Sequence, residues 1–191
     1  MARTKEFDPD AALRRALDLF WERGYEGTSL ADLVERTGVA RASLYATFGG
    51  KHELYVKALD LYYRSRPPIV DELSRPGPVL PALRALVQRY ATESSGESLM
   101  GCMVVNAAVE MAGHDATAAR LVEASWTELE TALASGLVRA RAQGEISPDR
   151  DPRALARFLL VLFQGMRVLG RAPGGEARLR DAADQAMALL A

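Results

Sequence analysis

A short run of residues near the N-terminus combines side chains that can recognise a nucleic-acid surface. Arg41 carries a guanidinium that can pair bidentately with a guanine edge or with a phosphate, and Ser43 and Thr47 add hydroxyl groups at helical spacing. Ala42 and Ala46 are small, and their methyl groups can meet a thymine. Because a helix with such a slim, donor-rich face fits the major groove of DNA, we predict that this run binds DNA.

Two short helices joined by a tight turn are predicted to position this run. Ser29 followed three residues later by Asp32 has the spacing of a capping box, and Gly38 ends the first helix with a residue that tolerates a left-handed backbone. Leu44 and Phe48 repeat at helical spacing on the second helix and can anchor it to a core. This layout is a helix-turn-helix with the donor-rich face on its second helix.

Five short motifs occur in a fixed order over residues 7–63. They are Ala16-x-x-Leu19-Phe20, Gly24-Tyr25-x-Gly27-Thr28-Ser29-Leu30, Gly38-Val39, Leu44-Tyr45-x-x-Phe48 and Lys51-x-x-Leu54. In this order and spacing they resemble the DNA-binding domain of TetR-type one-component transcriptional regulators. Ala40 stands where that family often has Ser, Thr47 where it often has His, and Gly49-Gly50 where it has Pro-Ser or Gly-Ser. These departures leave the phosphate contacts and the operator sequence open.

The resemblance implies which residues contact DNA. Tyr45 would place its hydroxyl on a phosphate, and Thr28 and Lys51 would lie at helix N-termini, where backbone N–H groups already favour phosphate. Arg41 and Lys51 as ordinary solvated cations, and Tyr45 as a core residue, remain alternatives. The predicted set of DNA-contacting residues is Thr28, Arg41, Ala42, Ser43, Tyr45, Thr47 and Lys51.

These contacts are few for one subunit. Two copies on a near-palindromic operator, with recognition helices about 34–36 Å apart, would supply the missing affinity and specificity. The partners we expect are therefore double-stranded operator DNA and a second copy of the chain.

Composition is that of an ordinary globular protein. The chain has 191 residues, of which 49% are hydrophobic and 26% charged, and its net charge of -1 neither supports nor opposes DNA binding. The run Phe158–Phe163 is far shorter than the roughly 18 apolar residues that span a membrane, and the N-terminus lacks an apolar signal region. One cysteine excludes an internal disulfide. We expect a cytoplasmic protein without a membrane partner.

The rest of the chain has helical periodicity throughout. Asp8-Pro9 predicts a helix start, and a fourth helix begins near Lys51 and stops before Pro67-Pro68. Further helices are predicted over Val79–Glu93, Leu99–Ala112, Asp115–Gln143, Asp151–Gly170 and Glu176–Ala191. We therefore predict an all-α fold of about nine helices, with a helix-turn-helix domain at 1–63, a bridging segment and linker at 64–78, and a helical effector-binding and dimerisation domain at 79–191.

The last two predicted helices are candidates for a dimer interface. The helix over Asp151–Gly170 is apolar on nearly every face, and the last helix is rich in small residues that allow close approach. In the family that this chain resembles, these two helices pair with their copies as a four-helix bundle; a buried helix of a monomer is the alternative. The predicted interface residues are Phe158, Leu159, Leu162, Phe163, Met166, Leu179, Ala183, Met187 and Leu190.

A small-molecule pocket is predicted from large, adaptable side chains with a few polar groups, a mixture that also suits any helical core. We expect an apolar or aromatic effector and no cofactor or metal. Cys102 follows Gly101 at a helix start, where the dipole favours a reactive thiolate, so it is either an electrophile or redox sensor or an inert core residue. The predicted pocket residues are Tyr62, Tyr90, Met100, Cys102, Met103, Asn106 and Trp126.

Two other classes of function compete with this interpretation. An enzyme is disfavoured because two histidines and one cysteine accompany no nucleophile-elbow, metalloprotease or phosphate-loop motif. A helical interaction module that has lost DNA binding is the second alternative, and the presence of Thr28, Arg41, Tyr45 and Lys51 argues against it. We predict a ligand-responsive regulator of transcription, most simply a repressor released by a small molecule, although an activator and one or two dimers per operator stay open.

Overall fold

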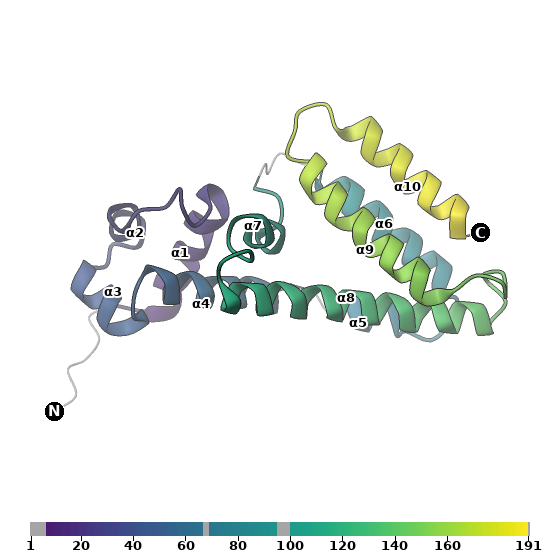
Figure 1. Ribbon diagram of the computed structural model, residues 1–191, viewed down its shortest axis with the longest axis horizontal. Helices are drawn as coiled ribbons and strands as arrows, with labels where there is room; N and C mark the ends of the chain where they lie inside the picture. Colours follow the sequence, from purple (N-terminus) through teal and green to yellow (C-terminus); the bar gives the residue numbers. More distant parts are fainter. Residues whose placement is uncertain (1–6, 67–68, 95–99, 191) are drawn as a thin grey trace. The chain divides into compact units, whose positions relative to one another are not determined.

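The computed structural model describes residues 7–66, 69–94 and 100–190, and all regular secondary structure within these ranges is helical (Figure 1). The predicted all-α fold is confirmed. None of the helices in these ranges is both long and apolar enough to cross a membrane. The described residues form ten helices, which are α1 Pro9–Arg23, α2 Leu30–Thr37, α3 Arg41–Phe48, α4 Lys51–Arg64, α5 Ile69–Leu73, α6 Val79–Ser94, α7 Met103–Glu110, α8 Ala116–Ala142, α9 Pro152–Leu169 and α10 Glu176–Leu190.

The chain forms two compact units. The first contains the described residues up to Arg66 together with Asn106–Val122, and the second contains the remaining described residues. The domain limits predicted from the sequence differ from this division, because they assign all of 79–191 to one domain. In the structure Asn106–Val122 packs in the first unit, where Glu110 binds the turn before α2 and Asp115 contacts His52 at the start of α4. The functional domain limits stay a prediction.

Local capping signals fix the first helix. Asp8 accepts hydrogen bonds from the backbone N–H groups of Asp10 and Ala11, so the predicted start at Asp8-Pro9 is confirmed. Within the first unit α1 packs mainly against α4, where the rings of Phe20 and Tyr55 meet edge to face with their centroids 5.1 Å apart. Both rings are only 1% exposed, and this contact forms the centre of the first core.

The helix-turn-helix has the predicted construction. Ser29 and Asp32 form a complete capping box at the start of α2, and Gly38 ends that helix at a left-handed φ of 71°. Leu33, Leu44 and Phe48 are 0%, 3% and 6% exposed, so α2 and α3 are both fixed through their inward faces.

The second unit is built on the mutual packing of α6, α9 and α10, which lie side by side in Figure 1, together with buried side chains of α5 and α8. The short helix α5 lies in the segment that we predicted as linker. Helix α7 begins at Met103 rather than at Leu99, which lies outside the described residues. The later start follows from Gly101, whose φ of 68° is left-handed and interrupts a right-handed helix.

The turn between α2 and α3 gives a test of the backbone. Gly38→Ala places no new atom within 4 Å of another part of the protein, so its effect comes from the positive φ alone. We expect it to destabilise the protein by about 1–2 kcal/mol. Gly113→Ala, which also meets nothing within 4 Å and has no positive φ, is the matched control. Thermal unfolding followed by circular dichroism should separate the two variants; equal melting temperatures would contradict the argument.

Candidate nucleic-acid interface

Helix α3 presents a narrow exposed face. Arg41, Ala42, Tyr45 and Ala46 are exposed, and the shorter side chains of Ser43 and Thr47 on the same helix are half-buried. Tyr45 keeps 39% of its surface accessible, so it is not the purely core tyrosine that the sequence left as an alternative. The face combines one guanidinium, hydroxyl groups and two methyl groups, which is the chemistry that base edges and phosphates recognise.

The cations around this face fall into two groups. Arg41 Cζ lies 5.5 Å from the centroid of the Tyr45 ring, and Lys51 Nζ lies 4.2 Å from that of Tyr25, and neither cation forms an ion pair within the described part of the chain. Since an aromatic ring does not neutralise a cation, both charges stay available to an anion. Three arginines of α1 and α2 have oxygen acceptors instead: Arg15 on the Thr37 carbonyl at 2.9 Å, Arg23 on Asp32 at 3.2 Å and Arg36 on Glu22 at 2.7 Å.

The N-termini of α3 and α4 lack side-chain caps. Ala40 precedes α3 and Gly50 precedes α4, and neither can supply a hydrogen-bond acceptor from its side chain. The first backbone N–H groups of both helices are therefore left for an outside acceptor, and the positive end of each helix dipole favours a negative one. Such termini suit phosphate groups on either side of a recognition helix.

Thr28 occupies a different position from the one predicted. Its side chain is 0% exposed, and Thr28 Oγ1 donates to the Gly24 carbonyl at 2.7 Å. The residue precedes the N-cap Ser29 and satisfies a carbonyl at the end of α1, so its hydroxyl is not offered to DNA. The Thr28 hydroxyl is thus bound inside the protein, and a DNA contact of this residue stays a prediction.

Two supporting side chains were missed by the sequence analysis. Lys57 Nζ donates to the Phe48 carbonyl at 3.2 Å, at the C-terminus of α3, where a cation complements the helix dipole. Arg15 does the same for α2 through the Thr37 carbonyl. Neither contact follows from local spacing, because the partners lie 9 and 22 residues apart.

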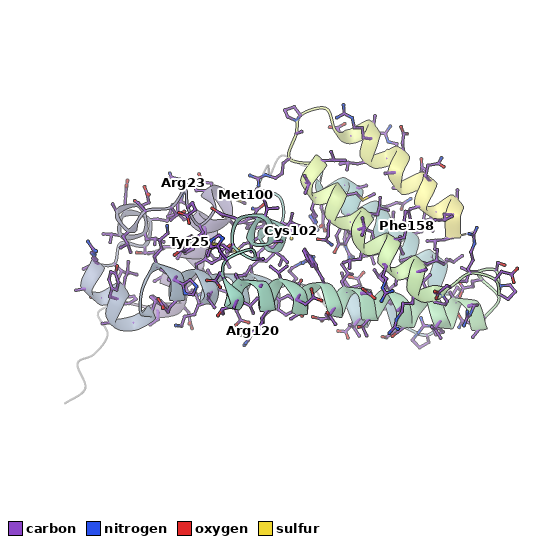
Figure 2. All side chains as sticks on the ribbon, viewed as in Figure 1. Arg23, Tyr25, Met100, Cys102, Arg120 and Phe158 are labelled. Atoms are coloured by element: carbon purple, nitrogen blue, oxygen red, sulfur yellow. The ribbon has the colours of Figure 1, made fainter. Side chains whose placement is uncertain are left out.

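The predicted effector residues are divided between the two units. Tyr62 and Asn106 belong to the first unit and the other five to the second. Tyr90 stacks on Phe163 with ring centroids 4.1 Å apart, and Cys102, labelled in Figure 2 just before α7, is 3% exposed. Trp126 is half-buried, and its Nε1 is buried without a hydrogen-bond partner among the described residues.

A separate hollow of about 390 Å³ opens on the second unit. None of the predicted effector residues lines it. Its walls carry three arginines, one acid and apolar side chains of the α5–α6 connection and of α6, so it is chemically unlike the predicted pocket. The lining residues are Glu72, Arg75, Pro76, Pro78, Ala82, Ala85, Arg89 and Arg139.

Most of the predicted dimer residues face inward. Phe158 is 40% exposed and Leu162 is half-buried, but the other seven lie in the core of their own chain. Each of these helices has an inner apolar face that packs against α6, so apolar character alone did not identify the outer face. The seven inward residues are Leu159, Phe163, Met166, Leu179, Ala183, Met187 and Leu190.

Comparison with protein families agrees with the two-part organisation. Residues 12–58 match the family described as bacterial regulatory proteins, tetR family, and residues 79–187 match the tetracyclin repressor-like C-terminal domain. The first match includes the helix-turn-helix, and the second includes all helices from α6 to α9 and most of α10.

Individual relatives extend over most of the chain. An uncharacterized HTH-type transcriptional regulator of Bacillus subtilis, YezE, is 37% identical over 193 residues and covers 100% of both chains. The HTH-type transcriptional repressor ComR of Escherichia coli is 34% identical, over 88% of this chain and 82% of ComR. Among solved structures, a cysteine mutant of the TetR family regulator CifR in complex with 26-base-pair operator DNA superposes with a TM-score of 0.85 at 29% identity and covers 100% of each chain.

The helix-turn-helix geometry, the two family matches and full-length similarity to HTH-type regulators therefore lead to one assignment. The chain belongs to the TetR family of bacterial regulatory proteins.

Proposed function

We propose that this TetR-family regulator represses transcription by binding a near-palindromic operator as a homodimer, and that a small molecule releases it. The observation that carries the DNA-binding part is the exposed face of α3. Within the described part of the chain, the N-termini of α3 and α4 have no side-chain caps and Arg41 and Lys51 form no ion pair. Chromosomal DNA as the target makes the cytoplasm the expected location.

Base recognition falls to α3. Arg41 donates in a bidentate manner to a guanine, Ser43 and Thr47 donate to base edges or phosphates, and Ala42 meets a thymine methyl group. Tyr45 and Lys51 contact phosphates and fix the register without reading sequence. Two relatives support this assignment: ComR is described as a transcriptional repressor, and CifR is solved on operator DNA.

The proposed dimer uses the outer face of α9. Phe158, Val161 and Val168 are 40%, 71% and 52% exposed, and they follow one another at helical spacing with Gly165 between them. Such an apolar stripe on an otherwise polar surface is typical of a subunit interface. Leu189 on α10 is 36% exposed and extends the apolar surface to the neighbouring helix that the family uses for pairing.

The effector is proposed to bind in the second unit with an apolar or aromatic body and a hydrogen-bond acceptor. Trp126 supports the acceptor, because its buried N–H has no partner among the described residues and an unsatisfied buried donor is costly. Binding that differs between two conformations of the protein then changes DNA affinity, and DNA changes effector affinity by the same factor.

Replacing Arg41 tests the recognition helix. We expect Arg41→Ala to weaken binding to the DNA flanking the protein's own coding region by about 1–3 kcal/mol per subunit, measured by gel shift across a salt series. Arg178→Ala, which removes an equally exposed charge from α10, should leave the affinity unchanged. Binding without salt dependence, or equal effects of the two variants, would contradict phosphate and base contacts and favour an interaction module.

Replacing Val161 tests the dimer. In a symmetric interface, each subunit would bury one glutamate of the α9 stripe without an opposite charge. We therefore expect Val161→Glu to yield monomers at micromolar concentration. Light scattering after size-exclusion chromatography measures the mass directly. Val138→Glu on α8, at a site 52% exposed, is the matched control and should stay dimeric. A dimeric Val161→Glu protein would place the interface elsewhere.

Tryptophan fluorescence tests the effector site. A panel of aromatic carboxylates and phenols supplies the ring and the oxygen acceptor that Trp126 requires, and a binder should quench or shift its emission. Trp126→Phe, whose affinity is measured by titration calorimetry because the variant lacks the reporting indole, should bind that ligand about tenfold more weakly, which corresponds to one lost hydrogen bond of about 1.4 kcal/mol. Trp21→Phe, in the first unit, is the control and should bind as the wild type does. Equal affinities for all three proteins would exclude Trp126 from the site.

A further inference from the structure

We propose that Glu110 is the residue that couples the second unit to the DNA-binding helices, by holding the turn between α1 and α2. This inference rests on the proposed function, since coupling matters only if DNA binding is regulated. The proposal assigns this coupling to the carboxylate of Glu110, which is not part of the DNA-recognition surface.

Glu110 binds the turn through both of its oxygens. Glu110 Oε2 accepts a hydrogen bond from the backbone N–H of Tyr25 at 2.9 Å, and Oε1 accepts one from the N–H of Glu26 at 2.7 Å. The two donors are consecutive in the chain and lie 85 and 84 residues from their acceptor. A carboxylate that accepts from two backbone amides makes charge-assisted bonds, which are stronger than neutral ones.

The turn is shaped to receive this carboxylate. Gly24 precedes the two donors at a φ of 77°, and a Cβ placed on it would lie 2.8 Å and 3.0 Å from the two Glu110 oxygens. Any other residue at this position would be strained in its backbone and would also push the carboxylate away. The glycine at the end of α1 therefore has two roles. It stops the helix, which the sequence predicts, and it leaves room for the Glu110 carboxylate, which the sequence does not show.

Tyr25 connects the turn to a candidate phosphate contact. Its ring, labelled in Figure 2, lies 4.2 Å from Lys51 Nζ and packs edge to face on Tyr55 at 5.0 Å. Burial, followed by the Glu110 charge, raises the pKa of Tyr55 well above its usual value, so the carboxylate acts on the same aromatic core. A displacement of Glu110 therefore changes the support of Lys51 at the start of α4.

A second acid of the same connection also contacts the DNA-binding helices. Asp115 Oδ1 caps α8 by accepting from the N–H groups of Thr117 at 2.9 Å and Ala118 at 2.7 Å, while Oδ2 contacts His52 Nε2 in the first turn of α4. The bond from Ala118, and then that from His52, lower the pKa of Asp115. The end of α7, through Glu110, and the residue before α8, Asp115, therefore contact the α1–α2 turn and the start of α4.

Chain connectivity makes this segment a route for coupling. Asn106–Val122 belongs to the first unit, but the chain enters it from the second unit and returns to the second unit after it. Both crossings occur inside helices, because α7 starts at Met103 and α8 runs on to Ala142. A shift of either helix in the second unit must be taken up where Glu110 and Asp115 are bound, and this is the differential contact that allostery requires.

Hydrogen exchange of the full-length protein tests the proposal in two measurements. Glu110→Gln keeps the size of the side chain but offers a single oxygen acceptor, and Glu128→Gln on the exposed side of α8 is the matched control. In the free protein, we expect the Tyr25 and Glu26 amides to exchange at least about tenfold faster in Glu110→Gln than in the wild type or the control.

The second measurement uses a saturating operator fragment as the probe. In the wild type and in Glu128→Gln, DNA should slow exchange both in residues 7–66 and in residues 123–190. In Glu110→Gln, DNA at saturation should still slow exchange in residues 7–66 but should leave 123–190 unchanged. If Glu110 only stabilised the fold, Glu110→Gln would lower stability and DNA affinity, but saturating DNA would still slow exchange in both 7–66 and 123–190.

Three outcomes decide the matter. Unchanged exchange of the turn amides in Glu110→Gln overturns the proposed contact, and a wild-type response of residues 123–190 to DNA overturns the coupling. A protein that shifts no DNA in the salt-series experiment overturns the proposed function and the regulatory role with it; faster turn amides in Glu110→Gln would then still show that Glu110 holds the turn.

Discussion

A helix of eight residues is not stable alone in water, and the site of this protein depends on how its surroundings hold such a helix. Leu44 and Phe48 bury the inner face of α3, while Lys57 binds the carbonyl of Phe48 at its C-terminal end. The outer face of α3 does not have to pack against the core, so small and polar side chains on it cost little stability. The N-terminal end of α3 has no side-chain cap among the described residues, and an anion fits at that end.

The sequence predicted those features that depend on neighbours in the chain. The cap at Asp8, the Ser29–Asp32 box and the left-handed end at Gly38 are local, because donor and acceptor lie within three or four residues of each other. The bonds of Glu110 are not predictable in this way, since the chain between the partners is more than 80 residues long and no spacing rule joins them. Thr28 is a different case, because the carbonyl that its hydroxyl binds lies only four residues earlier, at Gly24.

Helix faces were harder to assign than helices. In α9 the apolar residues surround the helix, so periodicity predicted its existence but did not distinguish the inner side, with Phe163 at 0% exposure, from the outer side, with Val161 at 71%. The decision belongs to tertiary packing, because α6 and α10 take one side of α9 and leave the other. When a helix packs against the core on one side and against another subunit on the other, both sides are apolar, so the sequence pattern does not distinguish them.

Seven of the predicted dimer residues on α9 and α10 lie in the core of their own chain, and this position has a consequence for inheritance. In the homodimer proposed above, these residues complete the core within each chain, so separation of the subunits would not open that core and a chain could pair again with a different copy. Products of two alleles in one cell would then mix freely. A chain with a damaged recognition helix and an intact α9 would draw normal chains into half-functional pairs, so a defect in α3 would be dominant, whereas a defect that unfolds the second unit would be recessive.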